Sequence, residues 1–117
     1  MSARGLKTYY ASLGDEIVSE AMRAFDKFGE QTVLSDEQWL AILSEEVGEA
    51  AHELTLDMPP VTTTLDPLAL RAEVVQIGAV ALRWVAVIDD ALAELAAPGQ
   101  VEAPYAHARS MRYARRR

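Results

Sequence analysis

The sequence predicts an all-α fold, a helix bundle of three main helices per chain that is completed by oligomerisation. Apolar residues recur with helical spacing in three long segments, and helix-capping residues stand before two of them. No segment of useful length alternates apolar and polar residues as a half-buried strand would. Half of the 117 residues are hydrophobic, which argues against disorder, and a chain of this length is expected to form one domain.

The first helix is expected from about Gly14 to Phe28. Gly29 then favours an end to the helix, because glycine adopts the left-handed cap conformation without strain. One face of this segment carries the apolar positions Ile17, Val18, Ala21, Met22 and Phe25.

The second helix is expected to begin after Ser35 and to reach about Leu56. The Ser35 hydroxyl can cap the free amides, and Gln38 completes a capping box. The predicted core stripe consists of Leu40, Leu43, Val47, Ala50, Ala51 and Leu54. The neighbouring stripe begins apolar and becomes acidic, and consists of Trp39, Ile42, Glu46, Glu49 and Glu53. These acids therefore border the core.

The third helix is expected after a connection at 57–66, whose paired prolines and threonines suit no helix interior. Asp66 caps it, and Pro67 occupies a first position where a missing N–H costs nothing. The helix should continue to about Ala97.

Between residues 74 and 88 this helix has only two polar side chains, Gln76 and Arg83. A helix that is apolar nearly all round must be buried nearly all round, and so small a chain needs a second subunit for that. We therefore expect a homodimer or homotetramer. The apolar run is shorter than the roughly 20 residues of a membrane span and contains Arg83, so no membrane span is expected.

Two acidic pairs on different helices are the main functional signal. Glu46 and Glu49 are three residues apart and share a helical face, and Glu73 and Gln76 repeat that spacing. If the two helices pack side by side, four oxygen-bearing side chains converge. Carboxylates on nearly apolar helices need neutralisation, for which Mg²⁺ or Mn²⁺ is suited. A Glu-Glu-x-x-Glu triplet alone is more often a solvated face, but its coupling to a second pair favours a metal site.

Three segments, 27–31 (Lys-Phe-Gly-Glu-Gln), 45–49 (Glu-Glu-x-x-Glu) and 70–73 (Leu-Arg-x-Glu), resemble the MazG-like nucleotide pyrophosphohydrolases. These belong to the all-α NTP pyrophosphatase superfamily, and the resemblance covers about residues 20–90. The family pattern is Glu-Glu-x-x-Glu followed by Glu-x-x-Asp. Gln76 stands where the family usually has aspartate.

The resemblance implies Mg²⁺-dependent hydrolysis of nucleoside or deoxynucleoside triphosphates to monophosphate and pyrophosphate, with nucleotide-pool house-cleaning as a role. It implies that Glu46, Glu49 and Glu73 are metal ligands, with Gln76 in the fourth ligand position. Glu45 would orient or deprotonate the attacking water. Lys27 and Gln31 become candidates for phosphate or base contacts, although both could simply solvate a helix end.

Several residues keep open or ordinary interpretations. Arg83 would pair with an acid across an interface or reach the triphosphate, and the sequence does not decide between the two. Trp39 and Trp84 are predicted to be core residues, and His52 a surface residue. The alternative function is a catalytically weakened or inactive relative that binds nucleotide or metal as a helical oligomer, having lost hydrolysis through Gln76. Retention of all the motif glutamates favours the enzyme.

Charge divides the chain into an all-α domain at 1–102 and a basic C-terminal tail at 103–117. The net charge is −7, but the first part carries six basic and eighteen acidic side chains, a balance of −12, and the tail has five arginines. Such a tail suits a nucleic-acid arm or docking on the acidic body; repulsion of phosphates by the body favours docking or active-site closure. The absence of cysteine and of a signal-like start suits a cytoplasmic protein.

Overall fold

Three α-helices form the structured part of the chain, which a computed structural model describes at residues 1–29, 33–55, 66–96, 100 and 102–105. They are α1 (Ala3–Phe28), α2 (Asp36–Thr55) and α3 (Pro67–Leu95). Those described residues contain no strand, so the all-α prediction is confirmed for them.

The starts of α2 and α3 lie where their capping residues predict. The Gln38 amide donates to Ser35 Oγ at 3.2 Å, and the Ser35 amide donates to Gln38 Oε1 at 2.8 Å, which completes the capping box. The Asp66 side chain accepts from the Leu68 amide at 2.9 Å, and Pro67 follows it in the first turn.

Helix α1 begins at Ala3 rather than near Gly14, so the expected start was wrong. Ser2 is the cap: its Oγ accepts a hydrogen bond from the Gly5 amide at 3.1 Å. The end is as expected. Gly29 has a φ of 76°, and its amide donates to the Phe25 carbonyl at 2.7 Å.

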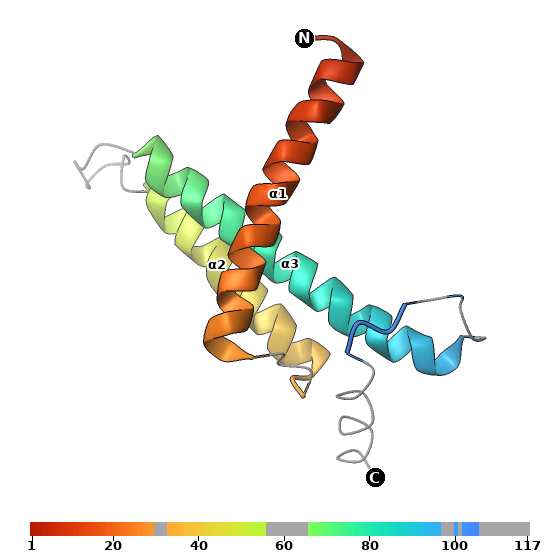
Figure 1. Cartoon of the computed structure of the whole chain (residues 1–117). Coiled ribbons are helices and arrows are strands. Elements are labelled where there is room, and N and C mark those ends of the chain that lie inside the picture. The colour runs from red at the N-terminus through yellow and green to blue at the C-terminus, as the bar shows by residue number, and fades with distance from the viewer. Residues whose placement is uncertain (30–32, 56–65, 97–99, 101, 106–117) are drawn as a thin grey trace.

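Helix α3 holds the fold together. It lies antiparallel beside α2, and α1 crosses the pair with its N-terminal half projecting away from them (Figure 1). Both other helices pack on α3, whereas α1 and α2 do not pack on each other within the described residues. The Arg71 guanidinium of α3 donates to the Glu16 carboxylate of α1 at 2.8 and 2.5 Å, which links the crossing helices.

The core lies between α2 and α3, around the fully buried indole of Trp39. Val80 and Val87 pack with it, and partly buried apolar residues surround them. Trp84 also contacts this core, as predicted, and its Nε1 donates to Asp36 Oδ1 at 3.1 Å. Tyr105 packs there too, so the first residues of the segment assigned to the tail return to the bundle.

The predicted core stripe of α2 was largely wrong. Leu40, Val47 and Leu54 are 53%, 49% and 51% exposed, whereas the neighbouring stripe of Trp39 faces α3. Burying the indole removes more apolar surface from water than burying a leucine, and this turns the helix. His52 is exposed, as expected.

One chain does not bury the whole circumference of α3. Ala79, Val80 and Val87 are buried, but Val85 and Ile88 remain exposed. Among the described residues, none of the helices combines the length and apolar character needed to cross a bilayer.

Candidate functional site

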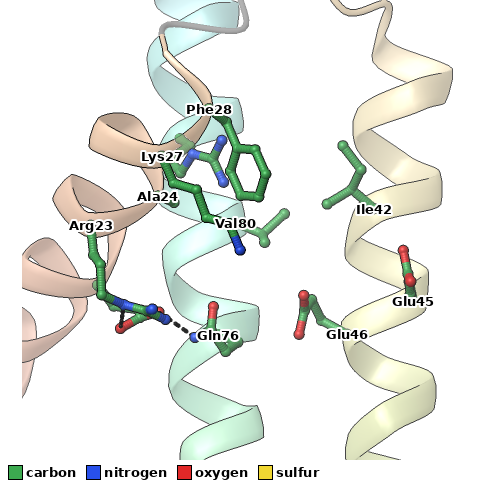
Figure 2. Close-up of a pocket in the computed structure, with 11 residues that line it drawn as sticks. Arg23, Ala24, Lys27, Phe28, Ile42, Glu45, Glu46, Gln76 and Val80 are labelled. Atoms are coloured by element: carbon green, nitrogen blue, oxygen red, sulfur yellow. Dashed lines mark hydrogen bonds and ion pairs between the residues drawn. The ribbon is translucent and has the colours of Figure 1, made fainter.

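A pocket of about 330 Å³ lies between α1 and α2, with α3 as its floor. It exists because α1 and α2 both rest on α3 without packing on each other. Its volume is at the lower end of the roughly 300–1,000 Å³ that is usual for small-molecule sites. The pocket, much of which Figure 2 shows, is lined by Glu20, Arg23, Ala24, Lys27, Phe28, Ile42, Glu45, Glu46, Gln76, Val80 and Arg83.

Five residues singled out from the sequence line this one pocket: Lys27, Glu45, Glu46, Gln76 and Arg83. They come from all three helices and were expected from motifs far apart in the chain. Gln31 lies outside the described residues.

Glu46 and Glu49 of α2 and Glu73 of α3 form a carboxylate triad beside the pocket. One carboxylate oxygen from each lies within 4.8 Å of the others. The three-residue spacing puts the first two on one face, and the side-by-side packing of α2 and α3 brings the third to them. The predicted convergence is therefore observed for these three side chains.

Burial and crowding make the triad electrostatically unfavourable when it is fully ionised. Partial burial raises the pKa of Glu46, and the charges of Glu49, Glu73 and Glu45 raise it further. Burial also raises the pKa of Glu73, together with a hydrogen bond and charge from Glu49. The triad therefore favours either a proton or a cation.

The donor set fits a hard divalent cation, because it consists of carboxylate oxygens. Mg²⁺ and Mn²⁺ are the ions that such a set suits. Acidic groups also gather on protein surfaces without any ion, so the triad alone does not define a metal site.

Gln76 connects the pocket to α1. Its Nε2 donates a hydrogen bond to Glu20, which also pairs with Arg23. The bond from Arg23 lowers the pKa of the Glu20 carboxyl, burial opposes this, and Gln76 adds a smaller lowering. The Gln76 side chain faces Glu46 across the pocket (Figure 2).

Cationic side chains from α1 and α3 also line the pocket. Lys27 lies with its Nζ 5.0 Å from the centroid of the Phe28 ring, and Arg23 stands one turn before it on α1. The Arg83 guanidinium lies over the ring of Trp39 at 5.1 Å, and burial lowers the pKa of Arg83. Within the described part of the chain, the buried Arg83 Nη2 has no hydrogen-bond partner.

Sequence reasoning missed Glu20, Arg23 and the pocket role of Phe28. Glu20 and Arg23 could have been found from their three-residue spacing, which allows an ion pair on the helix surface beside the apolar stripe of α1. Phe28 is 56% exposed, and its ring lies on the pocket wall opposite Ile42 (Figure 2).

Comparison of the chain with protein-family models, with curated proteins and with solved structures gives no match in any of the three.

Proposed function

We propose that the chain is a Mg²⁺-dependent pyrophosphohydrolase that converts nucleoside or deoxynucleoside triphosphates to monophosphate and pyrophosphate. The observation that carries the proposal is one pocket with two oppositely charged walls. Glu45 and Glu46 stand on α2, with Glu46 a member of the carboxylate triad, whereas Lys27 stands on α1 across from them and Arg83 on the floor formed by α3. The resemblance of the motifs to the MazG-like enzymes supports the same reaction independently.

A bound triphosphate needs both the carboxylates and the cationic side chains of this pocket. A divalent cation held by Glu46, Glu49 and Glu73 would neutralise charge on the phosphate oxygens. Lys27 and Arg83, which both line the pocket, would contact phosphate oxygens directly. Glu45, exposed on the acidic wall, would accept a proton from the attacking water and orient it.

Apolar side chains would hold the base. The exposed ring of Phe28 and the side chain of Ile42 face each other across the pocket (Figure 2). Aromatic faces stack on any nucleobase, so this wall suits a nucleotide without selecting a particular base.

The hydrolytic test is a panel of nucleoside and deoxynucleoside triphosphates incubated with Mg²⁺, with monophosphate and pyrophosphate quantified separately. We expect both products in equal amounts, and loss of activity in Glu46→Gln. Asp26→Asn removes one exposed charge of α1 outside the pocket and should leave the rate unchanged. Release of diphosphate and orthophosphate would contradict the proposal. Tight Mg²⁺-dependent nucleotide binding without hydrolysis would support the inactive, binding relative instead.

We also propose that two copies pair through a third face of α3. Helices α1 and α2 cover the other two faces, and the remaining face carries apolar residues of which the first two are seven residues apart and the rest are alternately four and three residues apart. At 1.5 Å per residue, this stripe is about 30 Å long, and its spacing is that of a helix–helix seam. Its members are Val74, Ala81, Val85, Ile88, Leu92 and Leu95.

Light scattering coupled to size exclusion tests this pairing. The wild-type protein should have at least twice the mass of one chain at micromolar concentration, and Val85→Glu with Ile88→Glu should reduce it to one chain. Tyr10→Glu, at an exposed position on the projecting part of α1, should not change the assembly. A monomeric wild-type protein would refute the pairing.

A further inference from the structure

We propose that Tyr105 and Asp90 are positioning residues for the candidate pocket. Asp90 holds the C-terminal segment at 102–105 on the bundle. Tyr105 of that segment then keeps the guanidinium of Arg83 on the ring of Trp39, at the floor of the pocket. This inference rests on the proposed function in one respect, because it takes a phosphate group as the ligand of Arg83. Neither positioning residue lines the pocket, and both lie outside the segments that resemble the family motifs.

Asp90 anchors the C-terminal segment by its main chain. The Asp90 side chain is on α3 and only 1% exposed, and its Oδ1 accepts a hydrogen bond from the Tyr105 amide at 2.9 Å. A carboxylate so deeply buried costs free energy unless it is hydrogen-bonded. The bond places 102–105 beside the C-terminal half of α3 (Figure 1). The position of the Tyr105 side chain is therefore set relative to α3.

The Tyr105 side chain lies next to Arg83. It packs against the core cluster around Trp39, and it lines a small cavity of about 140 Å³ between α1 and α3. Arg83 lines this cavity too, and it also lines the candidate pocket. Arg83 is thus shared by the two cavities, so a change at Tyr105 can reach the candidate pocket through it.

Packing has a large part in orienting the Arg83 guanidinium. The guanidinium lies over the Trp39 ring at 5.1 Å, and its buried Nη2 has no hydrogen-bond partner within the described residues. Burial lowers the pKa of Arg83, and the nearby Tyr105 phenol opposes this. A planar guanidinium stacks well on aromatic faces. Removal of the Tyr105 ring would open space beside Arg83 and let its side chain leave Trp39.

A fixed Arg83 would favour binding of an anion. A long side chain that is already ordered in the folded protein loses little further rotamer entropy when a ligand arrives. The C-terminal segment would therefore contribute to ligand affinity without touching the ligand.

Nitrogen–proton NMR spectra of the arginine side chains follow Arg83 in the full chain without depending on catalysis. Protons above an aromatic ring are shifted upfield by its ring current. We expect an upfield Nε–H signal, assigned to Arg83 through Arg83→Lys, that moves to the position of exposed arginines in Tyr105→Ala and Asp90→Ala. Asp90→Asn keeps an oxygen that can accept from the Tyr105 amide, so it should keep the shifted signal.

Leu43→Ala is the matched control. Leu43 packs against the same core cluster as Tyr105 but lines neither cavity. It should lower Tm as Tyr105→Ala does, while leaving the Arg83 signal in place.

Calorimetric titration with Mg²⁺ and α,β-methylene-ATP, which cannot be cleaved at the bond of the proposed reaction, tests the effect on the ligand. Tyr105→Ala should weaken the Kd about tenfold, as expected for loss of a hydrogen bond from a charged donor. Leu43→Ala should leave the Kd unchanged. In an Arg83→Met background, Tyr105→Ala should have little further effect.

Four results would overturn the inference. The first is a wild-type Arg83 signal at the position of exposed arginines, and the second is a shifted signal that persists in Tyr105→Ala. The third is an equal movement in Leu43→Ala, which would show only a general loosening of the core. The fourth is equal weakening of the Kd by Tyr105→Ala with and without Arg83. Absence of analogue binding by the wild-type protein would instead refute the proposed function, and the NMR spectra would still decide whether Tyr105 positions Arg83.

Discussion

Glu46→Gln should make the metal-free protein more stable, yet leave it less stable than the wild type when Mg²⁺ is present. Oxygens of Glu46, Glu49 and Glu73 lie within 4.8 Å of one another. At that separation two unit charges repel by about 1 kcal/mol in a water-like dielectric, and Glu46 has two such neighbours. Salt screening and the persistence of the Glu46–Glu49 repulsion in the unfolded chain reduce the gain to on the order of 1 kcal/mol.

Mg²⁺ should reverse the order of stability. A ligand that binds only the folded state at 100 times its Kd stabilises it by about 2.7 kcal/mol. The wild-type protein would receive this stabilisation and Glu46→Gln only part of it. For a domain of roughly this size, 1 kcal/mol shifts Tm by about 4 °C, so both differences are measurable.

Differential scanning calorimetry in EDTA and in excess Mg²⁺ provides the comparison. Asp26→Asn is the control, since it removes the same charge from an exposed position outside the pocket. It should show no reversal. A Glu46→Gln protein that is less stable in EDTA would instead assign Glu46 a structural role, and equal Mg²⁺ stabilisation of all three proteins would refute binding at the triad.

Three further predictions concern pH, the core and helix packing. Because the pKa of Glu46 is raised in the folded protein, its carboxylate is protonated at a higher pH in the folded than in the unfolded chain as the pH falls. The gain in free energy of unfolding that Glu46→Gln gives in urea denaturation should therefore be largest above that pKa and shrink as the pH falls toward 4.5. Trp39→Ala should cost about 3–5 kcal/mol in the same assay, and Trp39→Phe much less, because Nε1 has no hydrogen-bond partner within the described residues. Gly14→Ala, with no atom within 4 Å of its added Cβ, should gain roughly 0.5–1 kcal/mol. Gly78→Ala should raise the free energy of unfolding by less, because its Cβ would lie 3.1 Å from Ile17 Cδ1. An equal rise in Tm for the two alanine variants would contradict the packing of α1 on α3.

Local chemistry made the starts of two helices predictable. Ser35 caps the amide three residues on and Asp66 caps the amide two residues on, so both caps can be recognised from a few consecutive residues of sequence. Ser2 caps α1 in the same way, and Leu6 and Tyr9 follow it at helical spacing. The early start of α1 was nevertheless missed, because this segment is mostly polar and its apolar side chains stay exposed.

Tertiary packing decided what local patterns could not. The face that α2 buries depends on a competition between Trp39 and the leucine stripe, which only the partner helix resolves. The convergence of the triad was predictable because it needs only two spacings and two adjacent helices. The contact of Gln76 with Glu20 was not, since it depends on the angle at which α1 crosses α3.

Crystals grown with Mn²⁺ and a non-hydrolysable triphosphate analogue would test the central claim most directly, through the anomalous signal of the metal. The proposed site predicts a peak bounded by oxygens of Glu46, Glu49 and Glu73, with the phosphates between that ion and the side chains of Lys27 and Arg83. A nucleotide bound elsewhere, or a pocket in which no anomalous peak adjoins the carboxylate triad, would contradict it.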